Sequence, residues 1–160
     1  IVRAPRGWHM SDARRVLVPI GGRREHSHLR ARLLASLSRS SERSLTFLHA
    51  IPGATAADER RRADTEVRSI ARDEAAGAYE VEVETTDDAK AAIIPRAAEA
   101  DLVIMGMQRR DRGQRPLGEL ALAIAQRTEV PLILISRRPQ RSLAGLTSAS
   151  FLASRAEDVR

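Results

Sequence analysis

The sequence of 160 residues contains no cysteine and very few aromatic residues. The lack of cysteine excludes disulfides, thiolate nucleophiles and cysteine-ligated metals, and it agrees with a reducing, cytoplasmic setting. Aromatic residues make up only 2% of the chain, so a hydrophobic core must consist of Leu, Ile, Val and Ala. Such a core is typical of helices packed on a sheet rather than of an all-β sandwich.

Lysine and long apolar runs are also scarce. Lys90 is the only lysine among 27 basic residues, and the formal net charge is +6. No apolar run approaches the roughly 18 residues of a transmembrane helix. The positive charge favours nonspecific attraction to anions, but the scarcity of aromatic side chains for base stacking argues against a nucleic-acid partner.

The first ten residues resemble a cloning scar. The segment "PRGWHM" (5–10) is similar to the vector-derived Pro-Arg-Gly-Ser-His-Met, with Trp8 in place of serine. We therefore interpret residues 1–10 as an expression-tag remnant and leave them out of the fold prediction. Met10 is either a true start or a vector residue. Residues 139–160 are predicted to be a tail, either one weak helix or disordered.

Residues 11–138 alternate apolar and amphipathic segments, which predicts one α/β domain. The apolar segments predict strands at 14–20, 44–51, 79–85, 101–106 and 130–136. The amphipathic segments predict helices at 25–39, 55–76, 87–99 and 117–127. This order predicts an open five-stranded, mostly parallel sheet with helices on both faces, a Rossmann-like fold. The strict alternation of 79–85 predicts an exposed or edge strand.

Two of the predicted helices have distinctive features. The first places four leucines on one face with arginines opposite: Leu29, Leu33, Leu34 and Leu37. The third contains Pro95, which removes a backbone hydrogen bond, so we expect a kink or a late helix start. Asp87 and Asp88 resemble a carboxylate pair, but capping of this helix explains them better.

Ligands of such sheets bind outside the carboxyl ends of the strands, where the strand order reverses. The loops at 21–26, 51–55 and 106–118 are therefore candidates. The stretch "IMGMQRRDRGQRPLGELALAIA" (104–125) begins like a phosphate-binding loop between a strand and a helix. Whether it is a working nucleotide site, an altered one or only a basic loop stays open.

The segments "VLVPI-GG", "LTFLHAI", "ADLVIMG" and "LGELALAIAQRTEVPLILI" resemble the universal stress protein domain over roughly residues 14–136. The resemblance implies an open five-stranded α/β fold. It also implies a homodimer through the last strand, and we predict the contact residues to be Val130, Pro131, Leu132, Ile133, Leu134 and Ile135. The alternative is that residues 143–152 bury this strand. Family members are also found fused behind membrane transporters, and one branch binds ATP.

The ATP-binding branch has a Gly-x-x-Gly, nine further residues and Gly-Ser or Gly-Thr, with an aspartate after the first strand. Here Gly106 matches the first glycine, but Arg109 replaces the second, Glu119 replaces the hydroxyl residue, and Gly21 replaces the aspartate. An arginine side chain obstructs backbone approach to phosphate, and Glu119 opposes its charge. Four loop arginines in turn favour anions: Arg109, Arg110, Arg112 and Arg115.

The resemblance implies a degenerate nucleotide or anion site. Its residues are Pro19, Gly21, Gly22, Ile51, Met105, Gly106, Arg109, Arg110, Arg115, Gly118 and Glu119. ATP, AMP and a cyclic dinucleotide are the ligand classes left open. His49 is predicted to be a core histidine bonded to backbone. His26 and His28 point to different sides of a helix, so no shared metal is expected.

No catalytic constellation is recognisable, and Lys90 lies far along the chain from the glycine motif. The leading hypothesis is therefore a non-enzymatic, dimeric, regulatory binding module, which would act on a fused or separate membrane transporter. One alternative is an ATP-binding stress protein that hydrolyses ATP slowly. The other is a nonspecific binder of nucleic acid or of an anionic surface.

Overall fold

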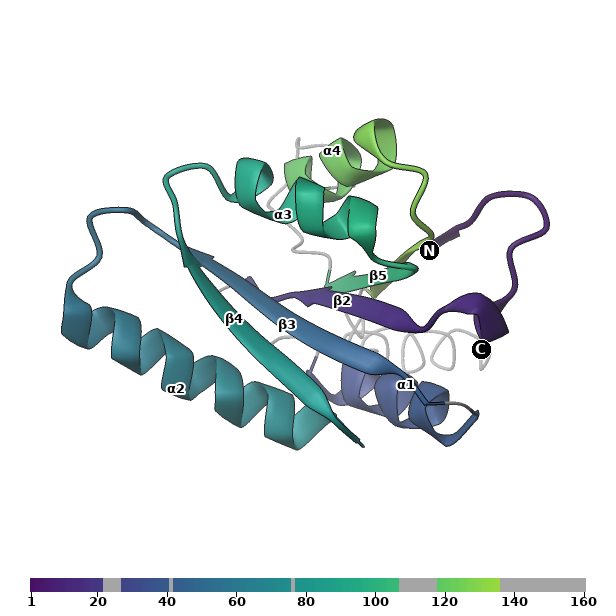
Figure 1. Ribbon diagram of the computed structural model, residues 1–160, viewed down its shortest axis with the longest axis horizontal. Coiled ribbons are helices and arrows are strands. Elements are labelled where there is room, and N and C mark those ends of the chain that lie inside the picture. The colour runs from purple at the N-terminus through teal and green to yellow at the C-terminus, as the bar shows by residue number, and fades with distance from the viewer. Residues whose placement is uncertain (22–26, 41, 76, 107–117, 136–160) are drawn as a thin grey trace, which may run out of the picture.

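The computed structural model of the chain describes residues 1–21, 27–40, 42–75, 77–106 and 118–135 (Figure 1). Its elements follow one another as β1 (Val2–Arg3), a 3₁₀ turn η1 (Met10–Asp12), β2 (Arg15–Pro19), α1 (Ser27–Ser40), β3 (Ser44–Ile51), α2 (Ala57–Glu74), β4 (Tyr79–Thr85), α3 (Ala89–Glu99), β5 (Leu102–Gly106), α4 (Glu119–Arg127) and β6 (Leu132–Ile135). The predicted strands and helices are therefore confirmed, with shifts of a few residues at their ends.

The strands form one sheet in the order β1-β6-β5-β2-β3-β4. The five strands β2 to β6 are mutually parallel, as the alternation predicted, whereas β1 is antiparallel to β6. The sheet therefore has six strands and not five. The additional strand comes from residues that the fold prediction had set aside, and two residues are too short to show a hydrophobic period.

The helices cover both faces of the sheet. Figure 1 shows α1 and α2 on one face and α3 and α4 on the other. Side chains of β2 alternate between two buried clusters: Val16 and Val18 pack on the α1/α2 side, and Leu17 packs on the α3/α4 side. This two-sided burial explains why the central strands are continuously apolar. None of the described helices combines the length and apolar character that crossing a membrane requires.

The N-terminal segment is attached to this domain. Trp8 and Met10 pack against the core cluster on the α1/α2 side. The guanidinium of Arg43 donates to the carbonyls of Met10 (2.8 Å), Ala13 (2.7 Å) and Leu37. One side chain thus ties the segment before β2 to the last turns of α1. The fold does not test whether residues 1–10 are a tag remnant, but it shows what they contact.

The leucine face of α1 is only partly as predicted. Leu34 and Leu37 are buried and Leu33 packs against the core, but Leu29 is 42% exposed. In the same helical turn Arg30, which the pattern placed on the outer face, is buried against α2. Its guanidinium binds both carboxylate oxygens of Glu74, at 2.5 and 2.8 Å. The α1–α2 contact therefore includes a buried ion pair where leucine periodicity alone predicts an apolar contact.

Helix α3 begins where its cap predicts. The carboxylate of Asp88 accepts hydrogen bonds from the backbone N–H groups of Lys90 (2.9 Å) and Ala91 (3.3 Å). The late start that Pro95 had suggested is therefore wrong. Proline at this position frees the carbonyl four residues earlier, at Ala91. Both Ala91 and Pro95 are exposed, so water can satisfy that carbonyl.

Candidate functional site

The strand order reverses between β2 and β5. From β2 the chain continues to β3 on one side, and after β4 it returns to β5 on the other side of β2. The connections after β2 and β5 lead to helices on opposite faces of the sheet (Figure 1). A crevice for a ligand is expected at such a reversal, outside the carboxyl ends of the two strands.

The carboxyl end of β2 is held in place by β3. The Ile20 N–H donates to the carbonyl of Leu48 at 2.8 Å, and Nδ1 of His49 lies 2.9 Å from the carbonyl oxygen of Ile20. Because a carbonyl oxygen only accepts, Nδ1 carries the proton in this contact. His49 is therefore bonded to backbone, as predicted, but it is half-buried and not part of the core. Gly21, the next residue, is exposed at the strand end.

Further predicted site residues lie at the same edge of the sheet. Pro19 is the last residue of β2 and pairs with Leu48. Ile51 and Gly106 are the last residues of β3 and β5. Met105 is 8% exposed and packs in the cluster on the α3/α4 side. Backbone topology alone gathers these positions, because parallel strands end at one edge.

Helix α4 points its N-terminus at this edge, since it follows the β5 connection. Gly118 is its N-cap residue and makes no side-chain hydrogen bond to the first turn. Apart from Gly118 itself and its two chain neighbours, no described atom lies within 4 Å of the Cβ that a larger residue would add there. Its φ of −57° is open to any residue, so backbone strain does not require glycine there. An uncapped helix start with free space beside it suits an anionic group.

Lys90 belongs to this region, which corrects the expectation that it lies far from the motif. Its Nζ is 2.8 Å from Oε2 of Glu119, the first residue of α4. The lysine therefore compensates the carboxylate that was expected to repel phosphate. The pair is solvent-exposed and contributes little to stability. Sequence reasoning missed it because 29 positions separate the two residues, and only the packing of α3 beside α4 brings them together.

The other predicted residues fall into two groups. Gly22, Arg109, Arg110 and Arg115 lie outside the described residues, as do Arg112 and His26. Asp87 and Asp88 serve local structure: Asp88 caps α3, and Asp87 Oδ1 accepts from the Gly53 N–H at 2.8 Å. His28 is exposed on α1. Among the described residues, no three His, Asp or Glu side chains gather as metal ligands would.

At the amino ends of the strands, opposite the predicted site, a carboxylate has a structural role. Asp101 precedes β5, and its Oδ2 accepts from the backbone N–H groups of Arg14 (3.1 Å) and Arg15 (2.8 Å). The Arg15 guanidinium adds a bond of 2.9 Å to Oδ1. The hydrogen bond from this guanidinium is the main reason why the pKa of Asp101 lies below its ordinary value. Asp101 thus joins the starts of β2 and β5, the two strands between which the strand order reverses.

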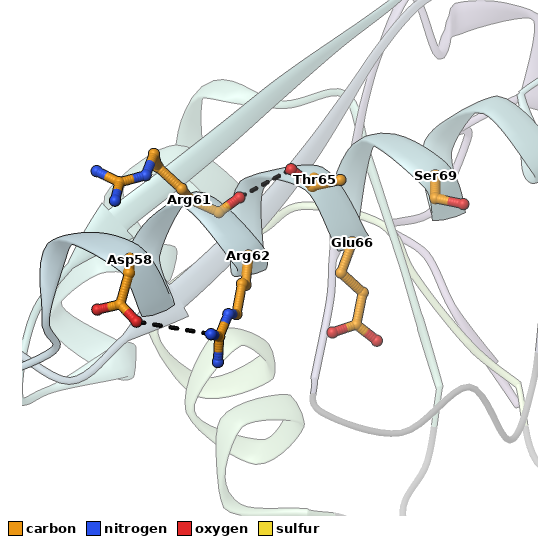
Figure 2. A pocket seen from close by; sticks show the side chains of 6 residues that line it. All are labelled: Asp58, Arg61, Arg62, Thr65, Glu66 and Ser69. Atoms are coloured by element: carbon orange, nitrogen blue, oxygen red, sulfur yellow. Dashed lines mark hydrogen bonds and ion pairs between the residues drawn. The ribbon is translucent and has the colours of Figure 1, made fainter.

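A pocket on α2 lies apart from the predicted site (Figure 2). All of its lining residues come from this one helix: Asp58, Arg61, Arg62, Thr65, Glu66 and Ser69. Arg62 Nη2 faces Asp58 Oδ2 at 3.8 Å, and Thr65 Oγ1 donates to the Arg61 carbonyl at 2.9 Å. These contacts are those of an ordinary charged helix surface, and none of the lining side chains is buried. We therefore assign no ligand to this pocket.

Comparison with known proteins agrees with the fold. The model of the universal stress protein family matches residues 13–136. The universal stress protein from Archaeoglobus fulgidus is 18% identical with a TM-score of 0.60, over 76% of this chain and 98% of that chain. No curated protein sequence matches the chain.

Two further solved structures contain nucleotides. A universal stress protein from Archaeoglobus fulgidus in complex with dAMP is 18% identical with a TM-score of 0.58, over 78% of this chain and 98% of that chain. A universal stress protein in complex with cAMP is 18% identical with a TM-score of 0.61, over 79% and 99%. At these identities the structures show a shared fold, and their ligands are properties of those proteins.

Proposed function

The chain belongs to the universal stress protein family, and we propose that it binds an adenine nucleotide between the carboxyl ends of β2 and β5. The proposed role is regulation through binding, without catalysis. One observation carries the proposal: the uncapped N-terminus of α4, with no other described residue close to Gly118, lies at the strand-order reversal. The adenine nucleotides in two structures of the same fold support the ligand class.

A ligand with a single phosphate suits this chain better than ATP. One phosphate can be held by the first turn of α4, where the backbone N–H groups and the helix dipole favour an anion. A triphosphate would also have to pass Glu119, whose charge Lys90 offsets only through an exposed contact. We therefore expect AMP or cAMP to bind more tightly than ATP, with a cyclic dinucleotide as the competing ligand class.

The first experiment is acid extraction of freshly purified protein, followed by mass spectrometry for nucleotides. Calorimetric titration with AMP, cAMP, ATP and a cyclic dinucleotide then ranks the affinities. A bound or tightly binding adenine monophosphate would support the proposal. Absence of binding for all four at millimolar concentration would contradict it and leave a protein-interaction domain. Tightest binding of the cyclic dinucleotide would instead indicate a sensor of that signal.

The variant Gly118→Asp tests the location of the site. Aspartate caps helices better than glycine by a few tenths of a kcal/mol, so the domain should be as stable as before or slightly more stable. Its carboxylate would occupy the anion position, so nucleotide affinity should fall at least about tenfold. Gly77→Asp is the matched control, because Gly77 also has free space around it but lies between α2 and β4. Equal affinity of both variants would place the ligand elsewhere.

The arginine-rich stretch needs its own test. Residues 107–117 connect Gly106 with Gly118 in the chain and carry the four arginines. If they bind phosphate in place of the family's glycines, Arg109→Gln with Arg110→Gln should weaken nucleotide binding about tenfold. Arg72→Gln on the exposed side of α2 is the matched control. Unchanged affinity would favour the degenerate-loop alternative.

The remaining functional hypotheses stay predictions. A non-enzymatic role predicts no release of phosphate from ATP above that of the Gly118→Asp variant. Regulation of a membrane transporter predicts a partner that responds to the bound nucleotide. The nucleic-acid alternative would need a continuous basic surface. Several arginines of the described part are instead paired with carboxylates, among them Arg62 with Asp58 and Arg68 with Asp64 on α2.

A further inference from the structure

The outer side of β4 has backbone groups with no strand beside them. β4 forms one side of the sheet, and no further strand lies beyond it in the described part of the chain (Figure 1). The Thr86 N–H, directly after β4, donates to the carbonyl of Ile51 in β3 at 2.7 Å. The backbone groups of successive strand residues point alternately to the two sides. The even-numbered residues of β4 therefore bond to β3, and the N–H and C=O groups of Val81 and Val83 point outward.

β4 lacks the features by which many edge strands avoid pairing. All seven of its residues are in unbroken register with β3, from Tyr79 opposite Leu45 to Thr85 opposite Ile51. The strand contains no proline, no glycine and no bulge. Protected edges are instead short, twisted by a bulge or interrupted by proline. The backbone of β4 is therefore suited to receive a further strand.

The two faces of β4 differ in chemistry, and each restricts which strand can be added. On one face Val81 packs against the core cluster on the α1/α2 side, and Val83 is half-buried on the same face. On the other face lie three glutamates, here called the glutamate row: Glu80, Glu82 and Glu84. An added strand places its side chains opposite both faces. Apolar side chains suit the valines, and positive side chains suit the glutamate row.

One contact in the structure shows that a guanidinium fits the glutamate row. Nη2 of Arg96, on α3, lies 2.9 Å from Oε2 of Glu82. Glu80 and Glu84 lie two residues to either side of Glu82 and are exposed. Side chains on one face of a strand are about 7 Å apart along it, in the row and in an added strand alike. Arginines at alternate positions of an added strand therefore match the spacing of the glutamates.

We propose that the outer side of β4 binds an extended segment of a partner protein in which arginine or lysine alternates with apolar residues. Main-chain hydrogen bonds to Val81 and Val83 attach the segment, and the glutamate row selects a positive segment over a neutral or acidic one. The β4 strand of a second copy does not fit, because its glutamates would face those of the first. The proposal does not depend on nucleotide binding, since this surface is separate from the carboxyl ends of β2 and β5.

Binding is measured by fluorescence anisotropy, with the full chain and the labelled peptide Gly-Arg-Val-Arg-Val-Arg-Gly. The control peptide Gly-Arg-Arg-Val-Val-Arg-Gly has the same composition without the alternation. It should bind about tenfold more weakly, because its arginines and valines cannot all reach their matching faces.

A pair of double variants tests the glutamate row. Glu80→Gln with Glu84→Gln should weaken binding of the alternating peptide about fivefold, since two cross-strand charge pairs are lost. Glu42→Gln with Glu59→Gln is the matched control, because both residues are exposed and lie outside β4. It should leave the affinity nearly unchanged. Circular dichroism confirms that each variant is folded.

The variant Val83→Pro tests the main-chain pairing. Proline removes an N–H that points outward and leaves in place the bonds to β3, which come from the even-numbered residues. Peptide binding should be lost, whereas Val83→Ala, which keeps the N–H, should bind nearly as tightly as wild type. If the proline variant does not fold, a peptide N-methylated at both valines and at the central arginine lacks the partner's donors instead. This peptide should not bind the wild-type protein.

Four results would overturn the proposal. Equal binding of the alternating and the control peptide would show attraction by charge alone. Equal affinity of the two glutamine double variants would place the peptide elsewhere. Binding that neither Val83→Pro nor N-methylation weakens would exclude strand addition. Absence of binding at millimolar peptide would show that this edge does not accept such a segment.

Discussion

The two sides of the sheet differ in how they protect the backbone groups of their outer strands from pairing with another chain. At one edge lies β4, with all seven of its residues paired to β3 and no further strand beyond it in the described part of the chain. At the other edge lies β6, four apolar residues long and covered by β1. An exposed strand edge invites pairing with another chain. The β4 edge depends on charge, whereas the β6 edge depends on a cover.

The charge of the β4 edge comes from its alternating pattern. Glu80, Glu82 and Glu84 share one face of the strand, and Arg96 of α3 binds Glu82 at 2.9 Å. The exposed like charges of Glu80 and Glu84 would oppose the approach of a second strand. The β6 edge has no such charge, because its side chains form core.

The largest expected difference between the two edges is in core packing. Leu134→Ala should lower the free energy of unfolding by about 2–4 kcal/mol, because Leu134 is 5% exposed and its removal leaves a cavity. Val83→Ala on β4 should cost no more than about 1 kcal/mol, since Val83 is only half-buried. Urea denaturation followed by circular dichroism measures both values. Similar losses would contradict the assignment of β6 to the core and β4 to the surface.

The next largest effect on stability is expected at Asp101, beside the central strands, and is compared with that of an exposed glutamate on β4. Asp101→Asn should lower the free energy of unfolding by about 1–2 kcal/mol at neutral pH, because Asp101 accepts bonds from Arg14 and Arg15. The pKa of Asp101 is lowered by folding. Its stabilisation is therefore present above the unfolded-state pKa of about 3.9 and is lost as the pH falls through the lower folded-state pKa.

Denaturation from pH 7 down to pH 2 should therefore show wild type and Asp101→Asn converging at the acid end. Glu80→Gln on β4 is the control, because Glu80 is an exposed carboxylate away from the backbone N–H groups that Asp101 binds. It should leave the pH dependence nearly unchanged. A constant difference between wild type and Asp101→Asn across the whole range would show that the charge of Asp101 is not what stabilises the strand starts.

Neutralising the glutamates of β4 should change stability less, but it should lower solubility measurably. Glu80→Gln with Glu84→Gln should change the free energy of unfolding by no more than about 0.5 kcal/mol. The neutral edge should aggregate faster, because the charges that oppose pairing are gone. Light scattering at high protein concentration measures this. Glu42→Gln with Glu59→Gln removes equal charge from exposed positions outside β4, and equal aggregation of both pairs would refute a role for the edge.

The smallest expected effect is that of Arg96→Gln. The Arg96–Glu82 pair is largely exposed to solvent, so its loss should cost at most about 0.5 kcal/mol and should vanish at high salt. Arg72→Gln, on the exposed side of α2, is the control for removing one arginine. A loss above about 1 kcal/mol would mean that Glu82 needs neutralisation for β4 to pair with β3.

Much of the fold could be predicted because each element leaves a local pattern. The central strands are short apolar runs, and the edge strand β4 shows strict alternation. Asp88 before α3 is a recognisable cap. Positions at strand ends follow from the same patterns, so Gly21, Gly106 and Gly118 could be assigned to one edge before any coordinates. Loop residues such as Arg109 lie outside what the structure describes, and their role remains a prediction.

What could not be predicted depends on contacts between residues far apart in the chain. Lys90 meets Glu119, and Arg30 meets Glu74, through the packing of neighbouring helices. Neither pair has a local signal, because a charged residue on a helix has the same pattern whether it faces water or another helix. β1 was not predicted, because two residues are too few to show a hydrophobic period and because its partner β6 lies at the other end of the chain.

The sequence by itself thus determined the order of strands and helices, the parallel sheet and the glycines near its carboxyl edge, since these depend on hydrophobic periodicity and turn residues. The tertiary structure alone decided how each end of the sheet is closed. Backbone groups at an edge can be satisfied by any segment that reaches them, and reach depends on where Arg43 and the β2 start hold the chain in space. The distance from the start of β2 to the outer side of β6 is a property of the folded domain, and no local sequence pattern encodes it.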